Sequence, residues 1–222
     1  MSDASATALE QLARDCRTAG LHFDAAWSPQ LARMIALLGD AARSQNLVGD
    51  PTPAGICGHI AEAISTVAVV TRSGVEPLAV ADVGAGAGVE AVVLALAFPT
   101  AAVFAVEPRR LRAEFIGHVK GALGLHNLHP VQATLHGALA RNLLPNRMDV
   151  ATARAVWPLQ EWVAKATPLV GPHGVIVVHG RGPLVTLQAE LAALGALRAA
   201  CLVPGDRGYA VAALAPTTSA AT

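Results

Sequence analysis

A carboxylate and three closely spaced glycines could together hold a ligand that carries a nucleoside. The stretch Asp82-Val-Gly84-Ala-Gly86-Ala-Gly88 follows an apolar run typical of a strand and precedes an apolar run typical of a helix. Glycine lets a ligand approach the backbone closely, and the first turn of a helix offers unpaired N–H groups. Glu107 ends a second apolar run, where a carboxylate can accept hydrogen bonds from both hydroxyls of a ribose.

The glycine spacing separates two classes of nucleoside ligand. Dinucleotide sites use G-x-G-x-x-G, which places a pyrophosphate at a helix N-terminus, but here the third glycine comes one residue early. Asp82 would repel a pyrophosphate, whereas it could bind the amino group of a methionine moiety. The pattern Asp-x-Gly-x-Gly-x-Gly resembles the donor loop of class I methyltransferases, which bind S-adenosylmethionine (SAM). A SAM site is favoured, and a dinucleotide site and an ordinary strand-to-helix turn are the alternatives.

Strands and helices are expected to alternate from residue 78 onward, which positions the glycine loop at the end of the first strand. This rhythm predicts a mostly parallel sheet with helices on both faces. The last two strands, on either side of Pro204-Gly-Asp-Arg207, should form an antiparallel hairpin that closes the sheet. The fold class is therefore α/β, of the Rossmann-like class I SAM-dependent methyltransferase type. Strands are expected at 78–83, 101–106, 128–132, 148–152, 174–179, 198–203 and 208–214, and helices at 88–97, 109–123, 157–167 and 183–195.

The chain before residue 75 reads as helical. Apolar residues recur at helical spacing in 1–20, 28–45 and 54–71. Ser28-Pro29 should begin the second helix, with serine as the cap and proline in the first turn. We expect residues 1–74 to form an N-terminal helical cap, 75–216 the SAM-binding core, and 217–222 a frayed tail.

Composition excludes some classes of protein. With 53% apolar and 14% charged residues among 222, the chain suits one globular domain with a helical appendage. We expect no membrane span, since no strongly apolar uncharged run of 18 residues occurs. The three cysteines lack the spacing of a metal site or a disulfide framework, which favours the cytoplasm and predicts no metal. The zero net charge gives no global support for nucleic-acid binding.

An ordered series of motifs resembles one family of RNA-modifying enzymes. From residue 28 to 214 the chain is similar to the bacterial small-subunit ribosomal RNA guanine-N7 methyltransferases, also called glucose-inhibited division protein B. The matching motifs are Asn46-Leu47, His59-Ile60-x-Glu62, Asp82-Val83-Gly84-x-Gly86-x-Gly88, Glu107, Arg112 with Phe115, Leu125-x-Asn127, Asp149-Val150-x-x-x-Arg154-Ala155, Gly174, Gly180 and Arg207. The resemblance implies a SAM-dependent transferase acting on small-subunit ribosomal RNA or the 30S subunit.

The chain also departs from the family pattern. His179 stands where the family has Lys, Glu90 where a proline is usual, and Thr134-Leu135-His136 where it has Arg-x-Glu. Because most of the lost residues are polar or basic, the donor site is better supported than the ribosomal acceptor. The resemblance implies the following cofactor-binding residues: Asp82, Gly84, Ala85, Gly86, Gly88, Glu107, Pro108, Leu135, His136 and Arg154.

Arg154 is our candidate for orienting the methyl acceptor. It follows the expected strand 148–152, and a guanidinium can read guanine O6 or a phosphate. A salt bridge at the strand end is the alternative interpretation. His179 lies at the strand edge where α/β proteins bind ligands. The predicted substrate-binding residues are His59, Trp157, His179, Arg181 and Arg207, each of which could instead serve packing or lie in solvent.

Guanine N7 suits a site without an evident general base. Its lone pair is already available, and its methylated product is cationic. The (Asp/Asn)-Pro-Pro-(aromatic) motif of many amine methylases is replaced here by Ala151-Thr-Ala-Arg154. A small-molecule N- or S-methyltransferase on the same fold is the alternative function. A non-catalytic protein that binds SAM or RNA is the second alternative.

Overall fold

The computed structural model describes residues 3–42, 47–182, 184–192, 197–203 and 209–216. Within these residues, seven strands form one sheet in the order β3-β2-β1-β4-β5-β7-β6. All neighbours from β3 to β5 are parallel, and β7 runs antiparallel to both β5 and β6. This confirms the expected mostly parallel sheet with its antiparallel closing hairpin. The strands are β1 (Ala79–Val83), β2 (Ala102–Val106), β3 (Leu128–Val131), β4 (Met148–Thr152), β5 (Val170–Arg181), β6 (Leu197–Leu202) and β7 (Tyr209–Leu214).

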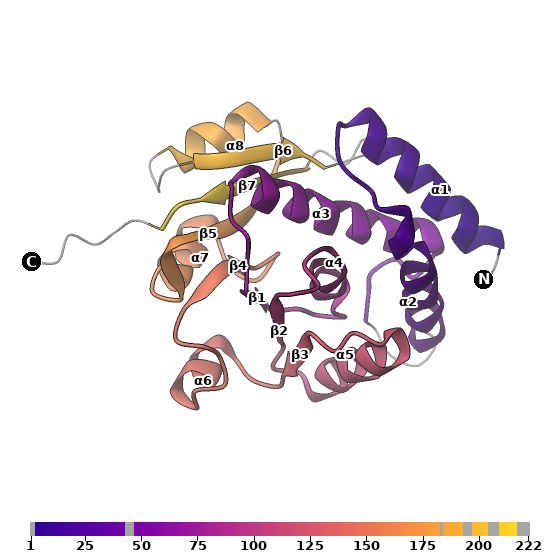
Figure 1. Ribbon diagram of the computed structural model, residues 1–222, viewed down its shortest axis with the longest axis horizontal. Coiled ribbons are helices and arrows are strands. Elements are labelled where there is room, and N and C mark those ends of the chain that lie inside the picture. The colour runs from indigo at the N-terminus through magenta and orange to yellow at the C-terminus, as the bar shows by residue number, and fades with distance from the viewer. Residues whose placement is uncertain (1–2, 43–46, 183, 193–196, 204–208, 217–222) are drawn as a thin grey trace, which may run out of the picture.

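Helices cover both faces of the sheet, so the strands alternate apolar side chains between two buried layers. On β5, Val175 and Val177 join one hydrophobic cluster, and Ile176 and Val178 join the other. The first cluster contains α1 (Asp3–Thr18), α2 (Ser28–Ala41), α3 (Pro53–Arg72), α4 (Val89–Ala97) and α5 (Arg110–Leu123). The second contains α6 (Leu135–Ala140), α7 (Leu159–Ala166) and α8 (Leu184–Leu191). Figure 1 shows these layers around the sheet.

α3 links the N-terminal helices to the sheet. It packs against α1 and α2 on one side and against α4, β6 and β7 on the other (Figure 1). It is long and apolar enough to cross a membrane, but 67% of its most apolar window is buried inside the protein, as in a core helix. Because one hydrophobic cluster spans α1 to α5 and the sheet, the division into a cap of 1–74 and a core of 75–216 remains a prediction.

Several local expectations were wrong or incomplete. A 3₁₀ helix, η1 (Ala25–Trp27), leads directly into α2, so Trp27 is the N-cap and Ser28 lies inside the helix. Helix α6 was not expected; Thr134 caps it by accepting a hydrogen bond from the Gly137 N–H. β5 begins four residues earlier than expected, at Val170.

Candidate functional site

The glycine loop follows β1, and its three glycines adopt backbone angles that other residues rarely take. Gly84, Gly86 and Gly88 have φ values of +80°, +59° and +80°. A Cβ on Gly84 would lie 2.4 Å from Val156 Cγ2, and one on Gly88 would lie 2.8 Å from Ile116 Cγ1. At Gly86 the nearest atoms would be 3.8 and 3.9 Å away. Packing and backbone conformation therefore disfavour any other residue at Gly84 and Gly88, whereas a Cβ at Gly86 would make only ordinary contacts with Arg112 Nη1 and the Gly84 carbonyl oxygen.

Glu107 holds the loop from the neighbouring strand. The parallel register pairs Val83 with Val106, so the residues that follow β1 and β2 lie side by side. Glu107 Oε2 accepts a hydrogen bond from the Gly86 N–H at 2.9 Å, and Oε1 accepts one from the Arg109 N–H at 2.9 Å. Each carboxylate oxygen can accept a further hydrogen bond. Glu107 is therefore fixed beside the loop and retains acceptor capacity.

Asp82 presents a buried carboxyl group at the end of β1. Its side chain is 3% exposed, and Oδ2 has no hydrogen-bond partner within the described part of the chain. Burial raises the pKa of Asp82 well above its ordinary value, and the charge of Glu90 raises it further. A cation beside Asp82 would supply the missing partner.

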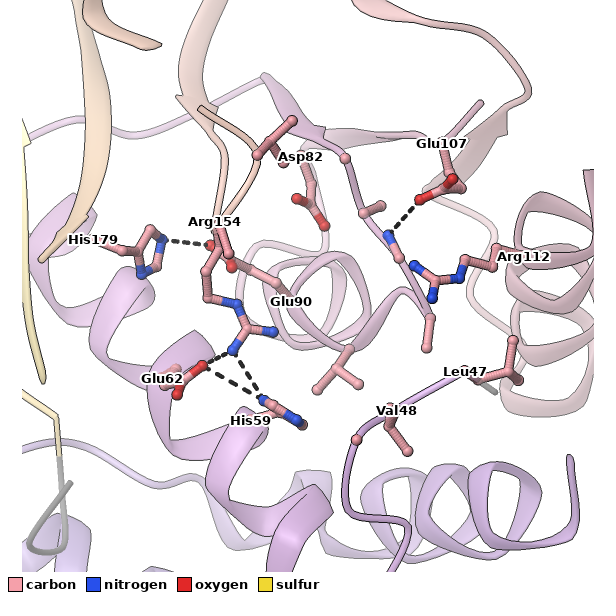
Figure 2. A pocket seen from close by; sticks show the side chains of 18 of the residues that line it. Leu47, Val48, His59, Glu62, Asp82, Glu90, Glu107, Arg112, Arg154 and His179 are labelled. Carbon is pink, nitrogen blue, oxygen red and sulfur yellow. Dashed lines mark hydrogen bonds and ion pairs between the residues drawn. The ribbon is translucent and has the colours of Figure 1, made fainter. Parts of the chain in front are cut away.

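Arg154, Glu62 and His59 form a second polar group, which faces the loop across the cavity (Figure 2). Arg154 Nη1 makes an ion pair with Glu62 Oε2 and lies 3.0 Å from His59 Nδ1. A guanidinium only donates, so Nδ1 must accept, and the neutral imidazole carries its proton on Nε2. The 3.6 Å between His59 Nδ1 and Glu62 Oε2 is then a close approach and not a hydrogen bond.

A third polar group lies deeper, where α3, α4, β4 and β5 meet. Glu90 Oε1 accepts hydrogen bonds from the hydroxyls of Thr152 at 2.8 Å and Thr66 at 3.0 Å. His179 Nε2 is 3.4 Å from the same oxygen and 3.2 Å from Thr152 Oγ1. The pKa of Glu90 is lowered, because His179 and the two hydroxyls outweigh the opposing effect of burial.

One cavity of about 740 Å³ joins the three groups, a volume within the range of roughly 300–1,000 Å³ usual for small-ligand sites. The loop after β4 borders it, turning at Ala155, whose φ is +56°, so that Val156 packs on Gly84. The predicted site residues that line the cavity are His59, Asp82, Gly84, Ala85, Gly86, Glu107, Pro108, Arg154 and His179.

Other predicted site residues lie outside the described lining. Gly88 packs behind the loop on Ile116. Leu135 is buried in the second hydrophobic cluster, and the neighbouring His136 is exposed on α6. Trp157 stacks on Trp162 with ring centroids 5.7 Å apart. Arg207 and the side chain of Arg181 fall outside the described residues. The geometry therefore gives no support to ligand roles for Leu135, His136 and Trp157, which remain predictions.

Residues that were not predicted as site residues also line the cavity. Glu62 and Glu90 are the acids of the second and third polar groups, and Arg109 and Arg112 border the loop. Glu62 was visible as a motif residue and Glu90 as a departure from a family proline, but neither pattern indicated a pocket-facing side chain. Thr66 and Thr152 carried no signal, because single threonines are common in buried helices and strands.

Comparison with known proteins identifies the family. The family model of GidB, rRNA small subunit methyltransferase G, matches residues 28–193. The chain belongs to this family. The proteins named Ribosomal RNA small subunit methyltransferase G from Acidovorax sp. (strain JS42) and Myxococcus xanthus (strain DK1622) are 32% and 30% identical to it. The first alignment covers 88% of each chain, and the second covers 85% of this chain and 84% of the relative.

Solved structures agree on the fold. Aeropyrum pernix fibrillarin in complex with S-adenosyl-L-methionine superposes with a TM-score of 0.54 at 15% identity, covering 70% of this chain and 76% of the other. The predicted family, class I fold and SAM-dependent methyltransferase activity are thus confirmed. The cavity fits SAM, because Gly86 leaves space for a ligand at the loop, Glu107 retains acceptor capacity, and Asp82 Oδ2 lacks a partner.

Proposed function

We propose that this methyltransferase G family member transfers a methyl group from SAM to N7 of a guanine in small-subunit ribosomal RNA. The main support for this proposal is the shared cavity, which has the glycine loop and Glu107 on one side and the Arg154–Glu62–His59 group on the other. Donor and acceptor can therefore meet in one cavity. The names of the relatives support the ribosomal acceptor.

The donor side of the cavity would hold SAM through three groups. The ribose hydroxyls would donate to Glu107, the amino group of the methionine moiety would bind Asp82, and the open side of Gly86 would admit the ligand to the backbone. Bound SAM supplies an electrophilic methyl group on a sulfonium. The protein's task is to orient the acceptor and exclude water.

On the acceptor side, Arg154 would donate to guanine O6 and so present N7 to the methyl group. N7 methylation places a positive charge on the base, and an isolated guanidinium nearby would oppose that charge. Glu62 pairs with Arg154 and offsets this repulsion. N7 itself has no proton to lose. Arg154 is therefore an orienting residue, and we propose that the reaction takes place in the cytoplasm.

The donor step is tested by calorimetric titration of the full chain with SAM. Absence of binding by folded protein would reject the function. Purified 30S subunits from a strain lacking this gene then test the acceptor: the enzyme should produce 7-methylguanosine, and a deletion that leaves ribosomal RNA methylation unchanged would reject the ribosomal substrate. That result would favour the small-molecule alternative.

Arg154→Ala tests the acceptor orientation. We expect its turnover to fall on the order of tenfold to a hundredfold, the loss of one charge-assisted hydrogen bond, and its SAM affinity to fall much less. The matched control is Arg110→Ala, which removes an exposed arginine that pairs with Glu114 on α5. Undiminished turnover in Arg154→Ala would reject the orienting role.

A further inference from the structure

Four polar side chains, from four different elements, meet at the carboxyl edge of the sheet, and the N7 transfer described above assigns them no step. Thr66 comes from α3, Glu90 from α4, Thr152 from β4 and His179 from β5. The side chains of Glu90 and His179 are 5% and 8% exposed, and both residues line the cavity. Burying a carboxylate and an imidazole costs free energy of folding unless each is paired, so the pairing within this cluster is needed for its stability in the pocket.

The hydrogen bonds fix where the proton of His179 lies. Each threonine hydroxyl has one proton, and Thr152 donates its proton to Glu90 Oε1 at 2.8 Å. Thr152 Oγ1 can therefore only accept from His179 Nε2, 3.2 Å away. The Nε2–H also faces Glu90 Oε1 at 3.4 Å. The neutral imidazole consequently carries its proton on Nε2 and a lone pair on Nδ1, for which the described residues provide no partner.

This arrangement suits a group that takes up a proton. When Nδ1 is protonated, the positive charge of the ring is shared with an Nε2–H that already faces a carboxylate. The other charged or titratable groups that line the cavity near the cluster are His59 and Glu62 of α3, Asp82 of β1 and Arg154 after β4.

His179 and Arg154 also lie at the same edge of the sheet. Thr152 pairs with Val177 in the parallel register of β4 and β5. Arg154 and His179 each follow two residues later, and both line the same cavity. Figure 2 shows the two side chains on neighbouring segments, with Glu90 beside them. A nucleophile that is bound by Arg154 would therefore lie near the edge of the sheet where His179 is located.

We propose that His179, anchored by Glu90 and Thr152, is a proton acceptor that gives this methyltransferase a second class of acceptor, an N–H or O–H group of ribosomal RNA. The nucleophile's lone pair forms the new bond to the methyl carbon while the carbon–sulfur bond breaks and its electron pair remains on sulfur, leaving S-adenosylhomocysteine. The acceptor's proton passes to His179 Nδ1 and then to water. The proposal rests on SAM-dependent methyl transfer to RNA, but not on N7.

The charge of the product distinguishes the two acceptor classes. Methylation at N7 gives a cationic nucleoside, whereas methylation at an N–H or O–H group with loss of the proton gives a neutral one. Unmethylated 30S subunits are incubated with methyl-labelled SAM and the full chain, digested to nucleosides and separated by charge. We expect a neutral methylated nucleoside among the labelled products.

His179→Gln should lower formation of the neutral product by about a hundredfold or more, the usual scale of general-base catalysis. His173→Gln is the control, since it replaces an exposed histidine on the same strand. If 7-methylguanosine is the only product, or if the neutral product does not depend on His179, the proton acceptor is rejected and the N7 function stands. A His179-dependent neutral product alone supports the proton acceptor and rejects N7. No labelled RNA rejects both.

A spectroscopic measurement keeps the proposal testable if His179→Gln fails to fold. Ring ¹⁵N NMR of the wild-type chain should show the neutral His179 with its proton on Nε2. A neutral ring protonated on Nδ1 would overturn the arrangement.

Discussion

Gly86→Ala separates the folding role of the glycine loop from its binding role. An alanine at φ +59° must adopt the left-handed region, which costs about 1–2 kcal/mol in the free energy of unfolding. No steric cost is added, since the nearest atoms to the new Cβ would be 3.8 and 3.9 Å away. The new methyl group would instead occupy space on the cavity side of the loop, where we place the donor.

Substitutions at two other glycines serve as controls for this prediction. Gly124 has a φ of +67° and open space around its Cβ position, so Gly124→Ala should cost the same about 1–2 kcal/mol without touching the cavity. Gly88→Ala adds the 2.8 Å approach to Ile116 Cγ1, and such overpacking should cost roughly 1–3 kcal/mol more. The expected order of stability without ligand is therefore Gly124→Ala equal to Gly86→Ala, with Gly88→Ala below both.

Urea unfolding with and without SAM provides the assay. At a SAM concentration of about one hundred times Kd, wild type and Gly124→Ala should each gain about 2.7 kcal/mol. Gly86→Ala should gain close to nothing at the same concentration, because its methyl group displaces the ligand from the backbone. A Gly86→Ala protein that keeps the full gain would refute the placement of SAM at this loop.

Three further predictions concern stability and reactivity. Asn127→Ala should lower the free energy of unfolding by about 2–3 kcal/mol in urea titrations and leave SAM affinity unchanged, because Asn127 Nδ2 lies 3.1–3.2 Å from the carbonyls of Ala95, Phe98 and Ala101. Burial and the charge of Glu90 raise the pKa of Asp82, so its contribution to the free energy of unfolding is complete below the ordinary aspartate pKa and declines as pH rises through the raised pKa. This decline should be absent when the unfolding of Asp82→Asn is measured against pH. A pH profile identical to that of wild type would contradict the burial argument. Burial raises the pKa of the Cys16 thiol to about 12, and Cys57 and Cys201 are also buried. Ellman's reagent should therefore react with the three cysteines only after the protein unfolds. Prompt reaction of the native protein would contradict this prediction and show that the core opens.

Most of the fold could be predicted from the sequence, because its elements are marked by strong local signals. The strands of a parallel sheet are buried on both faces and read as continuous apolar runs, as at Ala79–Val83 and Ala102–Val106. The glycine loop lay where such a run gave way to a helix. The order of β6 and β7 followed from the hairpin between them. These features depend on neighbouring residues, which a sequence displays directly.

Features that depend on contacts between distant segments could not be predicted. α6 is only six residues long, and Thr134 gave too weak a capping signal to reveal it. Leu135 and His136, whose cofactor roles remain predictions, lie on this helix. Likewise, Thr66 meets Glu90 across 24 positions, and Thr152 meets it across 62. Such pairings are set by the packing of α3, α4 and β4.

Two departures from the family pattern turn out to be one structural feature. Glu90 replaces a proline and His179 replaces a lysine, and considered separately each reads as a lost family residue. In the fold they face each other at 3.4 Å, with Thr66 and Thr152 completing the partners of the carboxylate. A carboxylate at position 90 without such partners would be strongly destabilising, so a change at 90 makes sense together with a partner at 179. Asp82, Gly86 and Glu107 match the donor motifs of the resemblance, whereas Leu135 and His136 depart from them. The residues at 90 and 179 therefore belong together structurally, since each supplies a partner for the other in the cavity that also holds Arg154.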